Sequence, residues 1–290
     1  MPIQRVETVP RLPKRQGDGH KGLYGNVLVL GGGRGMAGAP ALAGASALRS
    51  GAGLVRVVCP AEVQPTVACL EPSYLTYPLE NDAEGLIQFE TAVPVLERLL
   101  KPVDVVAVGP GLGQSDDVRQ LVRWVLENVS VPTVIDADAL NALAGQTQLL
   151  GSLHRPVIIT PHPGEFARLT ERSITEIQGD RETHAVALAQ AENIVVVLKG
   201  AGTIVTDGER LYVNTTGNPG MATGGSGDVL TGIISALLGQ GLGAFEAAQL
   251  GVYAHGLAGD IARDQNGEVG MIAGDIVDAV PDAFYHLGDS

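Results

Sequence analysis

The stretch "NPGMATGGSGDVLTG" at residues 218–232 places one carboxylate between a glycine-rich segment and an apolar run. A helix that begins near Ser226 presents unpaired N–H groups and the positive end of its dipole, which together bind anions such as phosphate. The neighbouring glycines let the backbone approach such a group closely. Asp228 is then a candidate base that deprotonates an attacking hydroxyl in phosphoryl transfer. The alternative interpretation is a glycine-rich loop with Asp228 as an ordinary helix cap.

A second glycine loop, "GRGMAG" at residues 33–38, matches the GxGxxG pattern of dinucleotide-binding proteins. The acidic residue expected near the end of the next strand is missing, because only Glu62 follows, and it comes late. We therefore interpret this loop as binding part of a ligand, without implying nicotinamide redox chemistry. The chain has no GxxxxGK[ST] pattern, which excludes a P-loop enzyme.

Two other loops carry titratable side chains. "LKGAGT" at residues 198–203 places Lys199 at a strand end, where it either cradles a nucleotide or is solvated at an ordinary hairpin turn. "TPHPGEF" at residues 160–166 holds His162 between two prolines, with Glu165 nearby, and this favours a ligand contact. A metal site is disfavoured there because no second histidine lies at ligand spacing.

The segment "DADALN" at residues 136–141 puts two aspartates at another strand end. We expect Asp138 to cap the following helix, and we leave Asp136 open between a structural role and metal or hydroxyl binding. No GxSxG elbow or Ser–His–Asp order indicates a hydrolase. The remaining histidines carry no motif and are interpreted as structural; they are His20, His154, His184, His255 and His286.

Buried apolar runs alternate with helical segments after an irregular lead over residues 1–20. The predicted strands or strand starts lie at 26–32, 53–60, 103–113, 132–140, 155–166 and 193–200, followed by a hairpin around "GE" at 208–209. The predicted helices lie at 37–51, 86–100, 115–128, 173–191, 226–239, 243–264 and 273–280. This alternation predicts one α/β domain over residues 1–290, with a mostly parallel central sheet and helices on both faces.

The polar loops follow the carboxyl ends of the predicted strands. In open α/β sheets, ligands bind outside those ends. We therefore expect "GGGRGMAG", "GPGLG", "DADALN", "TPHPGE" and "KGAGT" to gather at one edge of the sheet.

Composition restricts the class of protein. The net charge is −13 and the pI is near 4.8, and the sequence contains no basic stripe that could bind a nucleic acid. An acidic protein that handles phosphates must neutralise them locally, with amide groups, a few cations and Mg²⁺. The two cysteines, Cys59 and Cys69, form no CxxC pair, which fits a reducing cytoplasm. The sequence predicts neither a signal peptide nor a membrane span.

Several segments together closely resemble the ADP/ATP-dependent NAD(P)H-hydrate dehydratases, carbohydrate-kinase-related proteins of the ribokinase-like superfamily. The resemblance spans residues 20 to about 260. The segments that carry it are "HKGLYGNVLVLGG", "MAGAPALAGASALRSGAGLVRV", "GPGLG", "VIDADALN", "TPHPGEFARL", "LKGAGTIV" and "NPGMATGGSGDVLTGIISALL". It implies a three-layer ribokinase-like fold without the epimerase domain that is fused to some members.

The resemblance implies repair of a damaged cofactor. The S-form of hydrated NADH or NADPH (NADHX, NADPHX) is phosphorylated on its extra hydroxyl by ADP or ATP with Mg²⁺, and loss of phosphate restores the ring. Asp228 is implied as the base. Ala39, Gly111, Gly113, His162 and Asp228 are implied as contacts of the hydrated dinucleotide. Lys199, Gly200, Ala201, Gly202, Thr203, Gly225, Ser226 and Gly227 are implied as nucleotide contacts. The same resemblance implies a homo-oligomer, commonly a tetramer.

Two rival functions stay open at this stage. A small-molecule alcohol kinase of the same fold, acting on a hydroxyethylthiazole-like or pyridoxine-like alcohol, shares the "GSGD" motif but keeps its phosphorylated product. A non-catalytic nucleotide sensor on this scaffold would tolerate loss of Asp228. The combination of "TPHPGE" with "NPGMATGGSGD" favours the dehydratase over both.

Overall fold

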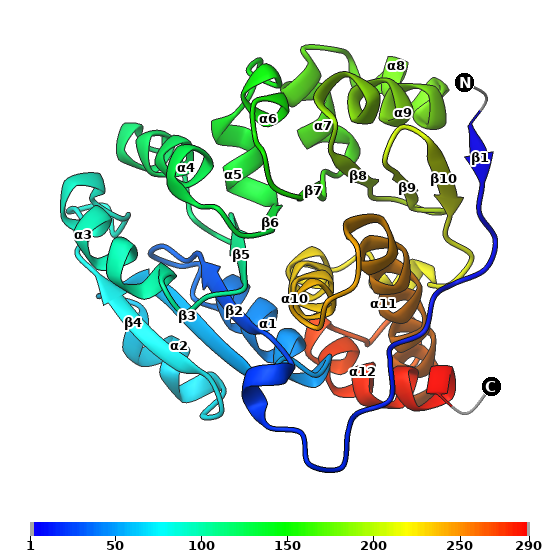
Figure 1. Ribbon diagram of the computed structural model, residues 1–290, viewed down its shortest axis with the longest axis horizontal. Helices are drawn as coiled ribbons and strands as arrows, with labels where there is room; N and C mark the ends of the chain where they lie inside the picture. The colour runs from blue at the N-terminus through cyan, green and yellow to red at the C-terminus, as the bar shows by residue number, and fades with distance from the viewer. Residues whose placement is uncertain (1–2, 289–290) are drawn as a thin grey trace.

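The computed structural model describes residues 3–288, which form one ten-stranded sheet between two layers of helices (Figure 1). The strands are β1 (Gln4–Arg5), β2 (Asn26–Leu30), β3 (Leu54–Pro60), β4 (Leu75–Leu79), β5 (Val105–Val108), β6 (Thr133–Ile135), β7 (Val157–Ile159), β8 (Val195–Leu198), β9 (Ile204–Thr206) and β10 (Arg210–Val213).

The sheet order is β1-β10-β9-β8-β7-β6-β5-β2-β3-β4. Within the described chain, only β9 runs antiparallel to its neighbours, so the predicted mostly parallel sheet is confirmed, as is the β9–β10 hairpin. After β2 the chain builds outward through β3 and β4, then returns to β5 on the other side of β2. The order of strands therefore reverses between β2 and β5, which is where ligands bind in such sheets.

Twelve α-helices and two short 3₁₀ helices are defined within residues 3–288. They are η1 (Lys21–Leu23), α1 (Gly38–Arg49), α2 (Gln64–Leu70), α3 (Phe89–Leu100), α4 (Asp116–Asn128), α5 (Ala137–Ala142), α6 (Gln148–Gly151), α7 (Pro163–Thr170), α8 (Ile174–Gly179), α9 (Arg181–Glu192), η2 (Pro219–Met221), α10 (Ser226–Gly239), α11 (Ala244–Asn266) and α12 (Ala273–Gly288).

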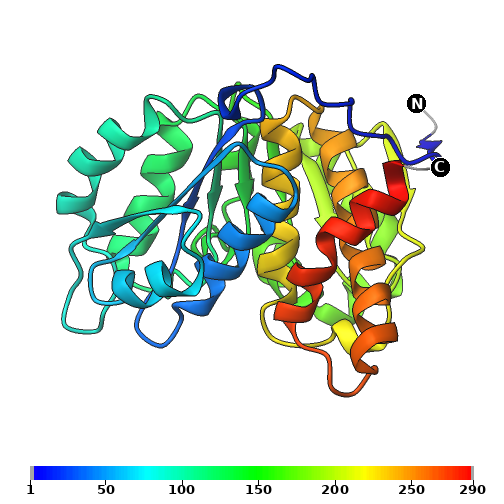
Figure 2. The same ribbon diagram turned by 90° about the horizontal axis from the view of Figure 1, so that it is seen from below.

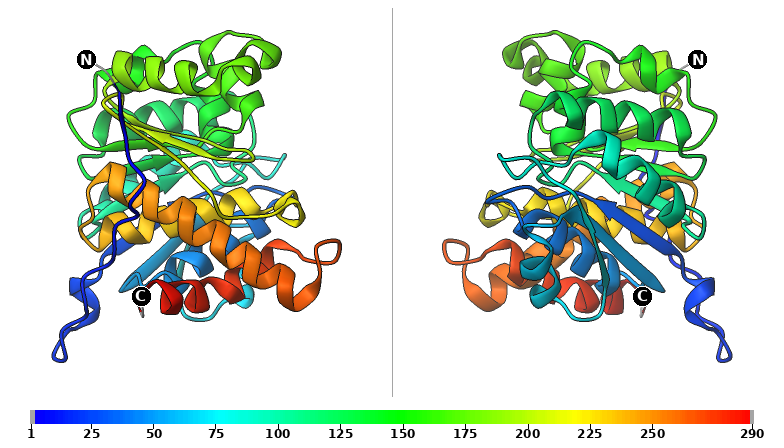
Figure 3. Two further views of the ribbon diagram at one scale, coloured as in Figure 1. Left: turned by 90° about the vertical axis from the view of Figure 1, so that its right-hand side faces the viewer. Right: turned by 90° about the vertical axis from the view of Figure 1, so that its left-hand side faces the viewer.

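Alternating strand residues divide the core into two halves. In β2, Val27 and Val29 face α1, α2, α10, α11 and α12, while Leu28 and Leu30 face α3 to α9. Because side chains alternate across a strand, the apolar run "NVLVL" is buried on both faces, as in other parallel sheets. Figure 3 shows the two helical layers above and below the strands, and Figure 2 shows α10, α11 and α12 lying together.

Helix α4 illustrates how local sequence sets an element. The Ser115 side chain accepts a hydrogen bond from the N–H of Val118, and two aspartates occupy the first turn, where negative charge is favourable. Apolar residues at helical spacing then bury one face against the sheet, and each buried leucine contributes about 1.5–3 kcal/mol.

The structure corrects several predicted elements. The irregular lead contains β1, which pairs with β10, and the segment after it runs along α11, where Gln249 donates to the carbonyl of Thr8 (Figure 3). The predicted 173–191 helix is two helices, because Asp180 leaves the helical conformation and caps α9 through its side chain. Helix α2 and strand β4 were not predicted, and α12 extends beyond 280 to Gly288.

Candidate active site

The loops that follow β2, β5, β6, β7 and β8 lie at one edge of the sheet, as the sequence predicts. These five strands are parallel and adjacent in the order β8-β7-β6-β5-β2, so their carboxyl ends emerge side by side. The start of α10 reaches the same edge, because a Cβ built on Gly227 would lie 3.1 Å from the Lys199 Nζ. The edge therefore brings together the anion-binding helix end and the charged loops.

A buried ion pair lies at the centre of this edge. The Lys199 Nζ donates to the Asp136 Oδ1 at 2.9 Å, and the other oxygen of Asp136 accepts from the Thr231 Oγ1 at 2.6 Å. Asp136 is 1% exposed. Although burial alone would lower it, Asp136 and Glu165 raise the pKa of Lys199 above its usual value. The loop after β8 thus carries a fixed positive charge, and Lys199 is not the solvated turn residue of the alternative interpretation.

The backbone around Asp136 is tightly constrained. The next residue, Ala137, has a φ of 50°, a left-handed conformation that non-glycine residues rarely adopt. Gly109 packs so closely that a Cβ there would lie 1.7 Å from the Asp136 carbonyl oxygen. Strained backbone persists only where the surrounding structure holds it in place, and it is found most often at functional sites.

His162 and Glu165 cap α7 reciprocally. The His162 Nδ1 accepts from the N–H groups of Gly164 and Glu165, and the Glu165 Oε2 accepts from the N–H of His162 at 2.8 Å. The Nδ1 is therefore unprotonated, and the proton of the neutral ring sits on Nε2. Burial, followed by the charge of Lys199, lowers the pKa of His162, whereas burial raises the pKa of Glu165. The His162 Nε2 lies 3.4 Å from the Glu165 Oε1, and half of the His162 side chain remains exposed, so part of the ring is accessible to a ligand.

Asp228 lies in the first turn of α10, partly buried beside the same charges. Burial, with the neighbouring Asp136, raises the pKa of Asp228 to about 7, although Lys199 opposes the shift. Ser226 and Val229 donate to backbone carbonyls, whereas the N–H groups of Gly227 and Asp228 donate to none within residues 3–288. A carboxyl group that titrates near neutral pH therefore stands beside free amide donors, as a general base in phosphoryl transfer requires.

Gly225 permits this geometry. It precedes α10 with a φ of 92°, and a Cβ there would lie 2.5 Å from the Leu42 Cδ1. Glycine adopts this left-handed backbone without the steric cost of a side chain. Ser226, the first helical residue, is 9% exposed, and its Oγ lies 3.3 Å from the His255 Nε2.

Three of the predicted dinucleotide contacts, Ala39, Gly111 and Gly113, lie at the switch point between β2 and β5. Ala39 is in the first turn of α1, and its Cβ lies 3.0 Å from a Cβ built on Gly111. Gly111 and Gly113 both have positive φ values, of 63° and 74°. The Gly113 N–H donates to the Asp138 Oδ2 at 2.8 Å. The predicted role of Asp138 as a helix cap is therefore wrong, because Asp136 holds the N-cap position and Asp138 anchors the glycine loop instead.

The remaining predicted nucleotide contacts, Gly200, Ala201, Gly202 and Thr203, form the β8–β9 turn directly after Lys199. Two further residues lie at this edge: the sequence did not single out Thr231, and His255 was interpreted as structural. Thr231 sits inside an apolar helix, and His255 lies in α11 without a motif. Burial lowers the pKa of His255 to about 4, so its ring is neutral at physiological pH.

No group of three or more His, Cys, Asp or Glu residues that could hold a metal ion occurs within residues 3–288. In the same part of the chain, no helix is long and apolar enough to cross a membrane.

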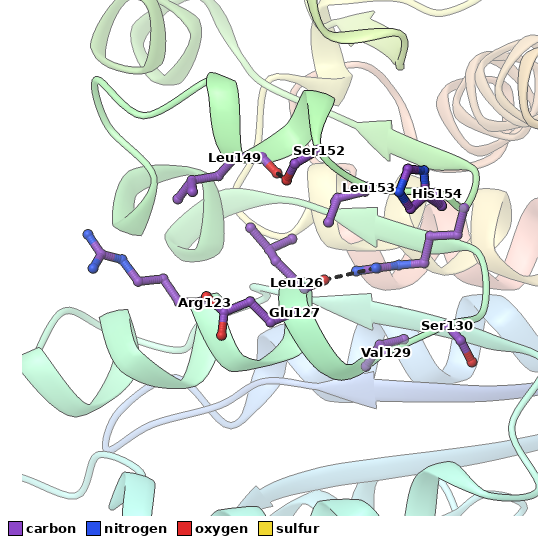
Figure 4. Close-up of a pocket in the computed structure, with 10 residues that line it drawn as sticks. Arg123, Leu126, Glu127, Val129, Ser130, Leu149, Ser152, Leu153 and His154 are labelled. Atoms are coloured by element: carbon purple, nitrogen blue, oxygen red, sulfur yellow. Dashed lines mark hydrogen bonds between the residues drawn. The ribbon is translucent and has the colours of Figure 1, made fainter.

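A cavity of about 400 Å³ lies away from this edge, where the turns leading into β6 and β7 meet the end of α4 (Figure 4). Its lining includes Arg155, whose guanidinium donates to the carbonyls of Leu126 and Val125 and to the Thr133 Oγ1. Two of these bonds go to carbonyls in the last turn of α4. The arginine therefore has a structural role, and the cavity is separate from the candidate active site.

The fold and the site define a ribokinase-like α/β protein. The structure is similar to a ribokinase-like superfamily protein of Enterococcus faecalis, with a TM-score of 0.83 and 27% identity over 98% of this chain and 96% of that one. It is also similar to the ADP/ATP-dependent NAD(P)H-hydrate dehydratase of Bacillus subtilis, co-crystallised with ATP and Mg²⁺. There the TM-score is 0.82 and the identity 32%, over 95% of this chain and 94% of that one.

The family is narrower than the fold. A family model described as NAD(P)H-hydrate dehydratase matches residues 27–282, so the chain belongs to this family. The bifunctional NAD(P)H-hydrate repair enzyme Nnr of Moorella thermoacetica is 49% identical over 273 residues, which are 93% of this chain and 51% of that protein. The chain thus spans about half the length of the curated relatives it matches.

Proposed function

We propose that this protein dehydrates the S-form of hydrated NADH or NADPH, with cleavage of ADP or ATP as the driving reaction. The terminal phosphoryl group is transferred to the hydroxyl of the hydrated ring. The ring nitrogen's electron pair then expels phosphate, and loss of a proton from the adjacent carbon restores the double bond. With ADP, the products are the reduced dinucleotide, AMP and phosphate.

The observation that carries this proposal is the position of Asp228. Its carboxyl group lies beside free amides at the start of α10 and titrates near neutral pH. As the general base it removes the proton from the attacking hydroxyl, while the amides stabilise charge on the transferring phosphoryl group. An anionic base next to a phosphate is unfavourable unless it takes up a proton in this way. The raised pKa supports that role.

Other residues at the edge fit the remaining tasks. Lys199, held by Asp136, supplies a fixed cation for the nucleotide phosphates, and Gly225, Ser226 and Gly227 let them approach the helix. The half-exposed ring of His162, whose Nε2 also lies 3.4 Å from the Glu165 Oε1, contacts the hydrated dinucleotide. The dinucleotide extends toward Ala39, Gly111 and Gly113. Gly200 to Thr203 complete the nucleotide site.

Mg²⁺ fits this site as a companion of the nucleotide. Both carboxylate oxygens of Asp136 already accept hydrogen bonds, and the described residues offer no cage of acidic ligands. Mg²⁺ commonly keeps several waters and binds through substrate phosphates, so nucleotide oxygens and water would be its main ligands. Its contribution is to neutralise phosphate charge in an acidic protein.

We further propose a homo-oligomer, a tetramer by family resemblance, which light scattering of the purified protein tests directly.

The function is tested by adding the protein to hydrated NADH or NADPH with Mg²⁺ and either ADP or ATP. We expect reduced-nicotinamide absorbance to return, with one nucleotide cleaved per ring restored. A stable phosphorylated alcohol formed from a vitamin precursor, without recovery from either hydrate, would replace the dehydratase with the alcohol kinase. Binding of nucleotide with no turnover of any of these compounds would favour the sensor.

A further inference from the structure

Arg181 lies outside the residues assigned above, yet its guanidinium holds the β8–β9 turn. It is the first residue of α9, directly after the Asp180 cap that separates α9 from α8. Its Nη1 donates to the carbonyl of Ala201 at 2.8 Å, and its Nη2 donates to those of Leu198 at 2.9 Å and Lys199 at 3.2 Å. One side chain therefore fixes three carbonyls of a four-residue segment.

The fourth carbonyl of this segment is also satisfied within the turn. The Gly200 oxygen accepts from the Thr203 Oγ1 at 2.9 Å. Across a trans peptide, the C=O of one residue and the N–H of the next point in opposite directions. Carbonyls drawn toward Arg181 and Thr203 therefore turn the following N–H groups away from those donors.

The amides of this turn are unused in the folded chain. Within residues 3–288, the N–H groups of Gly200, Ala201 and Gly202 donate no hydrogen bond to another group of the protein. Gly200 and Ala201 are exposed. Successive free amides in a turn, next to a lysine, are the groups from which anion-binding sites for phosphate are built.

The contact between Arg181 and the turn is close. Gly200 has a φ of 143°, and a Cβ built there would lie 3.0 Å from the Arg181 Nη2, so the guanidinium packs against bare backbone. The Nε of Arg181 is buried without a hydrogen-bond partner, which costs free energy. The guanidinium is thus placed by its bonds to the turn, while the side chain of Lys199 is placed separately by Asp136.

We propose that Arg181 is a positioning residue that shapes residues 199–202 into the amide-lined site for the phosphates of the nucleotide. It acts through the backbone of the turn and makes no contact with the reacting hydroxyl. This inference rests on the proposed function, because it assigns the nucleotide to this turn.

The test compares Arg181→Lys with the wild-type protein. Lysine keeps the charge, but its donors all radiate from one nitrogen atom and do not reproduce the planar spread of the guanidinium across the three carbonyls. Titration calorimetry with ADP and with ATP, each with Mg²⁺ and without the hydrated dinucleotide, measures the affinity for the nucleotide directly. We expect binding to weaken by about tenfold or more, the consequence of losing two charge-assisted hydrogen bonds that order the site. Arg172→Lys, an exposed residue paired with Glu176 in α8, is the matched control and should bind as the wild type does.

Kinetics and rescue separate positioning from a general structural role. In Arg181→Lys we expect the KM for the nucleotide to rise, with the KM for the hydrated dinucleotide within about twofold of wild type. In Arg181→Ala, millimolar guanidinium should restore part of the nucleotide affinity; if that variant does not fold, Arg181→Lys carries the test. Nucleotide affinity within twofold of wild type in Arg181→Lys, or an equal rise in both KM values, would overturn the proposal. A wild-type protein that binds no nucleotide would overturn the proposed function as well.

Discussion

Replacing Lys199 with methionine tests the buried ion pair at the centre of the site. Methionine approximates the length of the lysine stem but leaves the Asp136 carboxylate, 1% exposed, with Thr231 as its remaining side-chain partner. Removing one partner of a buried ion pair typically costs about 3–5 kcal/mol. Because the Lys199 side chain is 18% exposed and water screens part of the interaction, we expect the lower end, about 3 kcal/mol.

Urea unfolding at pH 7, followed by circular dichroism and linear extrapolation, measures the loss in unfolding free energy. The double variant Lys199→Met/Asp136→Asn should regain more than half of it, because the amide carries no charge and still accepts from Thr231. Lys101→Met, at an exposed position after α3, is the control and should stay within about 0.5 kcal/mol of wild type. A loss below about 1 kcal/mol, or no recovery in the double variant, would show that the ion pair does not hold this edge together.

Two further predictions follow from the same geometry. Because burial raises the pKa of Asp228 to about 7, kcat/KM should rise with pH as the carboxyl group loses its proton and level off above neutrality. The folded-state pKa of Asp228 lies above its unfolded value, so ionisation of Asp228 destabilises the fold as the pH rises from about 4 to 7. In urea unfolding, Asp228→Asn should therefore be more stable than wild type at pH 8, by at most about 4 kcal/mol. At pH 3 the two proteins should be equally stable. A flat pH–rate profile together with no stability difference at pH 8 would contradict this. Gly109→Ala should lower the unfolding free energy by about 3 kcal/mol or more and reduce activity, because its Cβ would meet the Asp136 carbonyl oxygen at 1.7 Å. Wild-type stability in this variant would show instead that the loop is free to move.

The sequence predicts the layout of the site because that layout depends on local patterns. Short apolar runs mark the strands, and the polar loop after each one marks its carboxyl end. Since neighbouring strands are parallel, the loops must meet at one edge. The glycine-rich segment before Asp228 is likewise a local signal, and the structure does begin a helix at Ser226.

Contacts across the chain could not be predicted in this way. Lys199 and Asp136 are 63 positions apart, and nothing in either segment indicates its partner. His255 and Thr231 are polar residues within largely apolar helices, where local sequence does not distinguish a site residue from a structural one. Asp138 satisfies the cap rule as well as Asp136 does, and only the fold shows that its carboxylate anchors the Gly113 loop.

The break between α8 and α9 has a different origin, because the sequence carries a local signal for it. The prediction of one helix over residues 173–191 overlooked Gly179 and Asp180, a poor helix former followed by a preferred N-cap residue. The structure instead interrupts it at Asp180, which caps α9 and brings Arg181 to the β8–β9 turn. The hydrogen bonds from Arg181 to the turn thus accompany a break at a glycine and a capping aspartate.

The most direct test of the account compares wild type with Asp228→Asn on hydrated NADH, with ADP or ATP and Mg²⁺. The wild type should restore reduced-nicotinamide absorbance, whereas Asp228→Asn should bind the nucleotide with similar affinity and lose at least about 100-fold in the rate of recovery. A variant that binds nucleotide and still turns over the hydrate within tenfold of the wild-type rate would contradict the assignment of Asp228 as the base.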